Sequence, residues 1–144
     1  MNNQIGFYEG DFYSLSNFSA HEVVIEGVTY ATAEHAYQVL KFSDSAQREK
    51  IKGAASAWLA REFGQSKKGR VENFDKIAVI KEIMRAKLLQ HEDVRAALIK
   101  TGDSIILKNH PGDDGFWGCG ADGTGQNVMG KIWMELRNEV AGKI

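Results

Sequence analysis

Three polar side chains near residue 40 have the types and the spacing to act together on one ligand. Glu34, Gln38 and Lys41 stand at positions i, i+4 and i+7, so in a helix, which advances about 100° per residue, they lie on one stripe. A carboxyl group can transfer a proton or stabilise a developing cation, and an unprotonated amine can attack carbon. The same spacing is common on solvent-exposed helix faces, so the pattern alone leaves both interpretations open.

A second candidate region is the glycine-rich segment from Pro111 to Gly125, whose composition is typical of an irregular loop. It contains GCGADG, from Gly118 to Gly123, which matches the dinucleotide fingerprint GxGxxG. That fingerprint belongs directly between a strand and a helix, and here neither is predicted to adjoin it. We therefore reject a Rossmann site.

The glycine-rich segment leads to Asn127 at the start of a predicted helix, with Lys131 one turn later. Free N–H groups and the helix dipole at such a terminus favour an anion, so we expect a phosphate site there. Trp117, beside Phe116, can stack on a base or a sugar. The alternative is that the Trp117 ring anchors the loop to the core.

Motifs of several other enzyme classes do not occur in the sequence. Its four histidines are scattered, and neither HExxH nor a Cys/His cluster is present. There is no GxSxG motif, and the single cysteine, Cys119, has no partner for an internal disulfide. We therefore expect neither a metal nor a cofactor.

The composition predicts one domain over residues 1–144, because the chain is 43% hydrophobic and short. No apolar run approaches the roughly 18 residues of a membrane span, so no membrane association is expected. A formal charge of −1 argues against nonspecific binding along nucleic-acid phosphates. The basic run Lys67, Lys68 and Arg70 is interpreted as a solvated loop, with local nucleic-acid contact as the alternative. The first residues lack the features of a secretion signal, which favours a cytoplasmic location.

The elements that position these residues are predicted to be mostly helical. Val23–Ile25 and Val28–Tyr30 indicate a hairpin, and residues 105–107 a short strand. The predicted helices cover residues 33–40 after the N-cap Thr32, 45–51 capped by Ser45, 54–63 ended by a left-handed Gly64, 74–90, 93–100 ended by Gly102, and 127–140. In the first helix Ala33, Ala36, Tyr37 and Leu40 should form the buried face. In helix 74–90 the charged residues should mostly lie off the apolar face; they are Lys76, Lys81, Glu82 and Lys87. This pattern predicts a helix-dominated α+β fold with a small sheet.

The order of four motifs resembles the YbiA/NADAR family. They are LSNF at 15–18, EHAYQVLKF at 34–42, TGD at 101–103 and DGFWGCGADGTGQNVMGKIWMELR at 114–137. The resemblance implies a compact α+β domain rich in helices. It also implies hydrolysis of N-glycosidic bonds, in phosphorylated ribosylaminouracil intermediates of riboflavin synthesis or in ADP-ribosylated guanine of nucleic acid.

The resemblance further implies which residues act. Glu34 and Lys41 are then catalytic, and the substrate contacts Asn17, Gln38, Asp114, Trp117, Gly118, Asn127 and Lys131. The sequence departs from many relatives at Phe74, where they carry Trp, and from some at Lys108 and Asn109, where they carry Glu, which bears on the choice of substrate.

The partner expected from the resemblance is the substrate itself, a small N-riboside phosphate or ADP-ribosylated guanine in nucleic acid. No obligate protein partner is expected. Two alternatives remain open: a module that binds ADP-ribose or a nucleotide without turnover, and a regulatory partner protein.

Overall fold

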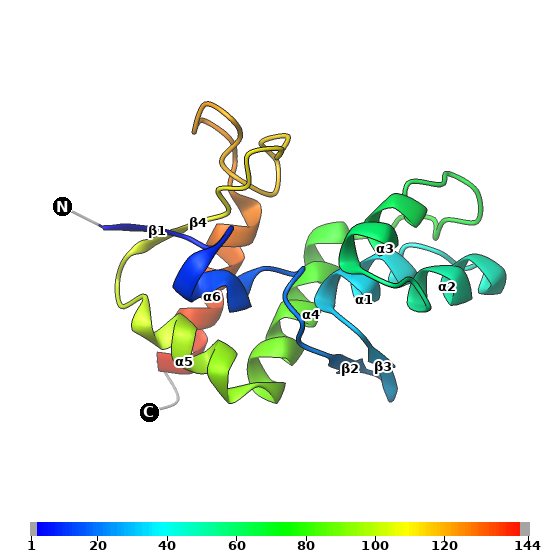
Figure 1. Cartoon of the computed structure of the whole chain (residues 1–144), viewed down its shortest axis with the longest axis horizontal. Helices are drawn as coiled ribbons and strands as arrows, with labels where there is room; N and C mark the ends of the chain where they lie inside the picture. Colours follow the sequence, from blue (N-terminus) through cyan, green and yellow to red (C-terminus); the bar gives the residue numbers. More distant parts are fainter. Residues whose placement is uncertain (1–2, 142–144) are drawn as a thin grey trace. The chain divides into compact units, whose positions relative to one another are not determined.

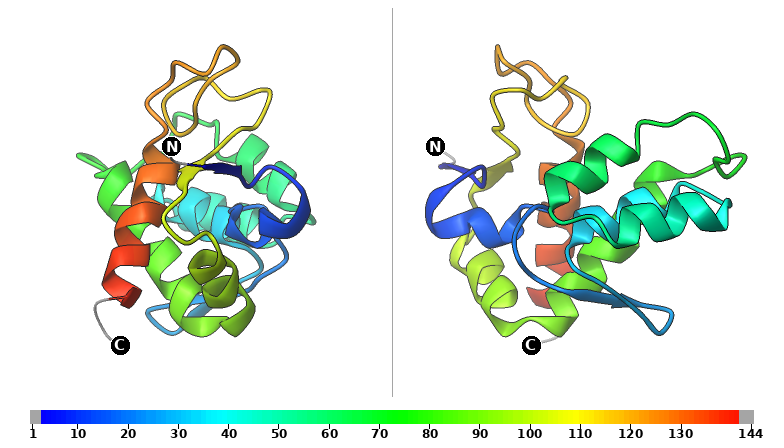
Figure 2. Two further views of the ribbon diagram at one scale, coloured as in Figure 1. Left: turned by 90° about the vertical axis from the view of Figure 1, so that its left-hand side faces the viewer. Right: turned by 45° about the vertical axis from the view of Figure 1, so that its right-hand side comes forward.

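The computed structural model describes residues 3–141, which group into two compact units (Figures 1 and 2). The loop unit consists of the residues up to Ser16 together with those from Glu92 onward. The helical unit extends from Asn17 to His91. The prediction of a single domain over the whole length stays a prediction.

The helical unit contains the predicted hairpin. β2 (Val23–Ile25) pairs antiparallel with β3 (Val28–Tyr30). Glu26 and Gly27 between them have φ values of 49° and 81°, as a two-residue type I′ turn requires. Local turn chemistry therefore fixes this element.

The first helix, α1 (Ala33–Leu40), begins at the predicted cap. The hydroxyl oxygen of Thr32 accepts a hydrogen bond from the N–H of His35, which satisfies one of the donors left open at a helix start. Unlike the prediction of one buried face, residues 32–39 are all buried, and Leu40 is only half-buried.

The burial of α1 follows from its neighbours, because it contacts both strands of the hairpin, α2 (Ser45–Lys52), α3 (Ala57–Phe63) and α4 (Lys76–Gln90). Figure 1 shows α1 in cyan with these three helices beside it. The polar residues of α1 are therefore enclosed along with its apolar ones, and burying them is favourable only where they are hydrogen-bonded.

The cap of α2 and the start of α3 differ from the predictions. Asp44, not Ser45, caps α2, and its carboxylate accepts from the N–H of Gln47 at 2.8 Å. A carboxylate one residue earlier is an equally good cap, and sequence alone does not rank the two. Ser56 caps α3, so the helix begins three residues later than predicted.

Two residues of the predicted helix 74–90 lie elsewhere than expected. α4 begins after its cap Asp75, and Phe74 lies outside the helix with its ring centroid 5.9 Å from that of Tyr37. Lys87, predicted off the apolar face, is fully buried and donates to the Ser19 hydroxyl at 2.6 Å. A tertiary partner from another segment offsets the cost of burying this polar group.

The loop unit contains β1 (Gln4–Gly6), the 3₁₀ helix η1 (Gly10–Leu15), α5 (Glu92–Lys100), β4 (Ile105–Leu107) and α6 (Val128–Ala141). β1 was not predicted, and it pairs parallel with β4 (Figure 1). α5 is followed by Gly102 with φ 61°, which agrees with the predicted helix end. α6 packs on β4, and Trp133 in it donates its indole N–H to the carbonyl of Leu15 at 3.0 Å.

The fold is thus α+β and dominated by helices, with its strands in two separate two-stranded sheets. This confirms the predicted class. Over residues 3–141, none of the helices combines the length and the apolar character that a membrane crossing needs.

Candidate active site

Glu34, Gln38 and Lys41 form a continuous hydrogen-bonded chain along α1. Gln38 Nε2 donates to Glu34 Oε2 at 2.7 Å, and Lys41 Nζ donates to Gln38 Oε1 at 2.9 Å. Glu34 is only 8% exposed and Gln38 4%. The Gln38 amide uses one end for the carboxylate and the other for the amine, so both partners fix its orientation.

The surroundings of Lys41 lower the pKa of its amine from 10.5 to about 8. Burial is the main cause because it disfavours the charged form, Arg70 and Arg61 add repulsion, and Glu34 partly opposes the change. With that pKa, about a tenth of the amine is unprotonated at pH 7. The unprotonated form is the one that can act as a nucleophile.

Tyr37 lies on the same helix, and its phenol stays protonated at neutral pH. Burial and the charge of Glu34 raise the pKa of Tyr37 to about 12, although Arg70 lowers it in part. Lys41 Nζ lies 6.0 Å from the centroid of the Tyr37 ring. Tyr37 is therefore a wall of this site with a hydroxyl that can still donate a hydrogen bond.

Asn17 lies beside Glu34, because its backbone carbonyl accepts from the Glu34 N–H at 3.1 Å. Its side-chain oxygen is buried and, within the described part of the chain, accepts no hydrogen bond. A buried acceptor in this state is costly unless a further donor satisfies it. A hydroxyl or amino group of a ligand is such a donor, which fits the predicted contact of Asn17 with substrate.

Gly64 has no side chain, and Gln38 occupies the space that a side chain at this position would fill. Its φ of −72° shows that the predicted left-handed conformation is wrong. A Cβ atom at this position would lie only 1.9 Å from Gln38 Oε1. Glycine is therefore required here by a close tertiary contact, and its carbonyl also accepts from Lys41 Nζ at 2.8 Å.

We expect Gly64→Ala to retain the fold but to lose roughly tenfold in turnover, because the added methyl displaces Gln38 and leaves Lys41 less well positioned. Gly53→Ala is the matched control. Gly53 also follows a helix with negative φ, −85°, but its added Cβ meets nothing closer than the Glu49 carbonyl at 3.4 Å. Steady-state kinetics and thermal unfolding of both variants test this, and equal activities would remove Gly64 from the site.

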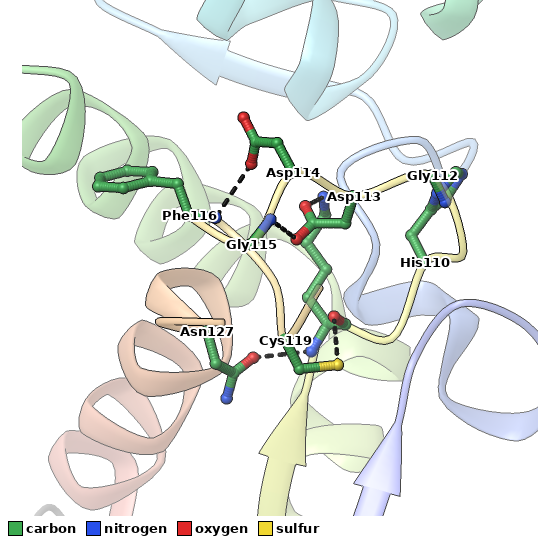
Figure 3. Close-up of polar contacts among 9 residues, drawn as sticks. His110, Gly112, Asp113, Asp114, Gly115, Phe116, Cys119 and Asn127 are labelled. Carbon is green, nitrogen blue, oxygen red and sulfur yellow. Dashed lines mark hydrogen bonds and ion pairs between the residues drawn. The ribbon is translucent and has the colours of Figure 1, made fainter. Parts of the chain in front are cut away.

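In the loop unit, the glycine-rich segment is held by its own polar groups (Figure 3). Asp113 accepts from Lys108 Nζ at 2.9 Å and from the Gly115 N–H at 2.8 Å. Burial opposes ionisation of Asp113, but these hydrogen bonds outweigh it and keep the pKa of the carboxyl below its usual value. Gly118 permits the close packing, because a Cβ there would lie 2.5 Å from the carbonyl oxygen of Lys108.

The start of α6 is not open to an anion in the way predicted. The N–H groups of Val128 and Met129 donate to the carbonyls of Phe116 and Trp117, at 3.1 and 2.9 Å. Loop carbonyls thus satisfy two of the donors that an anion could have used. Lys131 is exposed, and its contact with substrate stays a prediction.

Asn127 joins the loop to β4 through both ends of its side chain. Its Oδ1 accepts from the Lys108 N–H at 2.9 Å, and its Nδ2 donates to the Ile106 carbonyl at 2.8 Å. Asn127 is buried and has φ 51°, a conformation that Asn tolerates better than most residues. These contacts support the interpretation that Asn127 holds the glycine-rich loop in position against β4.

Two other predicted contact residues lie in the same loop. The Asp114 carboxylate accepts from the Phe116 N–H at 3.0 Å, and the Asp114 residue is exposed (Figure 3). Trp117 is half-buried and packs edge-on against Phe116, with centroids 4.9 Å apart. Both interpretations of Trp117, ligand stacking and anchoring, remain open.

The structure therefore brings together one set of predicted residues in each unit. The helical unit places side by side Asn17, Glu34, Gln38 and Lys41. The loop unit connects Asp114, Trp117, Gly118 and Asn127 through its backbone. Sequence reasoning missed Arg70, whose charge acts on Lys41, because its only signal was a basic run far along the chain from α1.

Comparisons with known proteins identify the family of this chain. Residues 6–141 match the model of the NADAR domain. The chain is 34% identical to the N-glycosidase YbiA of Escherichia coli over 142 residues, which are 95% of this chain and 88% of that protein. It is 37% identical to an N-glycosidase of Nostoc punctiforme over 132 residues, 88% of this chain and 84% of that protein.

Two further comparisons concern a longer relative and a solved structure. A riboflavin biosynthesis protein of Vibrio vulnificus is 37% identical over 97% of this chain, which matches 39% of that protein. The NMR structure of Escherichia coli YbiA matches with a TM-score of 0.88 and 33% identity, covering 99% of this chain and 88% of that one. This chain belongs to the NADAR domain family.

Proposed function

We propose that this protein is an N-glycosidase that hydrolyses the bond between a ribose C1′ and a nitrogen. The observation that supports this most is the enclosed chain Glu34–Gln38–Lys41, which places a carboxylate and an amine of lowered pKa on one helix. The names of the relatives from Escherichia coli and Nostoc punctiforme agree with the same bond type.

The chemistry of the bond calls for these two groups. Cleavage of C1′–N leaves positive charge on the sugar and an electron pair on the departing nitrogen. Glu34 stabilises the sugar cation, or takes a proton from the attacking Lys41 amine and gives it to the departing nitrogen. Lys41 attacks C1′ of the ring-opened sugar, so that an imine with the enzyme replaces the bond to the base. Water then hydrolyses the imine and releases the sugar aldehyde and the free lysine.

Two substrate classes share this bond and also carry phosphate. One is the phosphorylated ribosylaminouracils, favoured by the similarity to a riboflavin biosynthesis protein. The other is ADP-ribosylated guanine in nucleic acid. The residues at which this chain departs from relatives have local structural partners, since Lys108 binds Asp113 and the Asn109 side chain accepts from the Tyr8 N–H.

A substrate panel tests the proposal directly. Purified protein without added metal or cofactor is incubated with ribosylaminouracil phosphates and with ADP-ribosyl guanine in DNA, and products are separated by mass. We expect ribose 5-phosphate or ADP-ribose together with the free base from at least one class. Tight binding of ADP-ribose without product from any panel member would instead support the non-catalytic binding module.

A further inference from the structure

Arg70 is held next to the end of α1 by the backbone. Phe42 and Arg70 form an isolated antiparallel bridge, and the Val71 N–H donates to the Lys41 carbonyl at 2.8 Å. The guanidinium carbon lies 5.8 Å from the centroid of the Phe42 ring. A residue that the sequence places in a solvated basic loop is thus fixed beside the candidate active site.

The guanidinium group itself is positioned by three carbonyl oxygens. Its Nε donates to Ser66 at 2.7 Å, and its Nη2 donates to Gly64 at 3.2 Å and to Gln65 at 3.3 Å. Over residues 3–141, no acceptor is bonded to its Nη1 and no carboxylate pairs with it. Arg70 is exposed, so an outside ligand can reach a charge whose orientation is already set.

Arg70 and Lys41 share one acceptor. Lys41 Nζ and Arg70 Nη2 bond the same Gly64 oxygen, at 2.8 and 3.2 Å, so the two nitrogens lie within about 6 Å of each other. Two cations this close repel, and that repulsion contributes to the lowered pKa of Lys41. Glu34, which is bonded to Gln38, partly opposes it.

An anion is the ligand that this arrangement favours. It would compensate the repulsion, and the N–H groups of Arg70 Nη1, which the three carbonyls do not use, can donate to a phosphate oxygen in a charge-assisted hydrogen bond. In the substrates considered above, phosphate is attached to the ribose whose C1′ reacts. A phosphate bound at Arg70 leaves that ribose next to Lys41.

We propose that Arg70 is the binding residue for the phosphate group on the substrate ribose, and that it holds this group so that C1′ reaches Lys41. This assignment adds the phosphate-binding residue to the proposed function, and it rests on that function for the identity of the sugar. The phosphate is either the monoester of a ribose phosphate or the diphosphate of ADP-ribose.

Binding without turnover tests the assignment. Wild-type protein, labelled with ¹⁵N, is titrated with ribose 5-phosphate, ADP-ribose and plain ribose. We expect saturable shifts of the amide signals of residues 64–71 with the phosphorylated sugars and none with ribose. The tighter of the two phosphorylated ligands identifies the form of phosphate that the site prefers. Shifts centred on the start of α6, with none in residues 64–71, would overturn the proposal without any variant.

Three variants of the same segment complete the experiment. Arg70→Gln should weaken the binding of the phosphorylated sugars at least about tenfold. Arg70→Lys keeps the charge without the planar donor set and should recover part of the loss. Lys68→Gln removes an exposed charge from the same loop and should bind within about twofold of wild type.

Each outcome has a distinct meaning. Unchanged binding by Arg70→Gln, or an equal loss in Lys68→Gln, would overturn the assignment. Failure of the proposed function is separate, because it would appear as normal phosphate binding in the wild type together with no hydrolysis of any panel substrate. If Arg70→Gln does not fold, the location of the wild-type shifts and the affinity of Arg70→Lys still decide.

Discussion

Lys41→Arg is expected to lower the turnover rate by at least about a hundredfold while substrate still binds. The guanidinium keeps the positive charge beside Gln38 and Gly64, but its pKa is too high to yield a neutral nucleophile and it cannot form an imine with C1′. Single-turnover kinetics measure the loss, and calorimetric titration with a product sugar phosphate measures binding. A merely modest loss would assign Lys41 an electrostatic role.

The pH dependence of kcat/KM tests the role of Lys41 independently. If the neutral amine attacks, kcat/KM rises about tenfold per pH unit below the Lys41 pKa of about 8 and levels off above it. If the charged amine only binds an anion, the rate falls as pH passes the same value. Burial lowers this pKa most; among the charges, Arg70 and Arg61 lower it further and Glu34 raises it.

Trapping the intermediate gives a direct chemical test. Borohydride added during turnover reduces an imine to a stable secondary amine, so peptide mass spectrometry should find the sugar attached to Lys41. The Lys41→Arg protein, treated in the same way, is the control and should carry no adduct. Active wild-type enzyme without an adduct would exclude the covalent route.

Glu34→Gln is expected to lower turnover by about a hundredfold or more without unfolding the protein. The new amide keeps an oxygen that can accept from Gln38 Nε2, so the hydrogen-bonded chain of α1 can persist. What is lost is the negative charge and the ability to transfer a proton, whose usual contribution is about 10² to 10⁴. Kinetics on the substrate identified by the panel, with thermal unfolding as the fold control, measure the effect.

The same variant changes the amine next to it. Because Glu34 raises the pKa of Lys41, removing its charge should shift the rising part of the pH profile to lower pH. Residual activity with this shifted profile would show that Glu34 contributes to the rate and also raises the pKa of Lys41. Turnover near that of wild type would remove Glu34 from the mechanism.

The sequence predicts those features that depend on neighbours along the chain. Glu26 and Gly27 specify their turn, Thr32 caps α1, and the spacing of Glu34 and Lys41 places them on one stripe whatever surrounds the helix. These signals are local, since they depend on φ preference, a side-chain acceptor and helical geometry. The candidate stripe on α1 was therefore predictable from sequence.

The remaining features depend on contacts between distant segments. Gly64 is glycine because Gln38 needs its space, and Lys87 is buried because Ser19 accepts its hydrogen bond. Arg70 approaches Lys41 through a strand-like bridge with Phe42 that no periodicity predicts. The N–H groups of Val128 and Met129 at the start of α6 donate to loop carbonyls, which is also a contact between separate segments. Sequence patterns give residue types, but they do not tell which distant group satisfies them.

The lowered pKa of Lys41 also affects the folding equilibrium. In the unfolded chain this amine has its ordinary pKa near 10.5, whereas in the folded chain it is about 8, so between these values the unfolded chain binds more protons. Stability therefore rises with pH across this window, and below pH 8 the protonated amine opposes folding to the full extent that its burial and its cationic neighbours allow. At neutral pH the mostly protonated Lys41 amine therefore lowers the conformational stability, and the packing around α1 has to offset this loss.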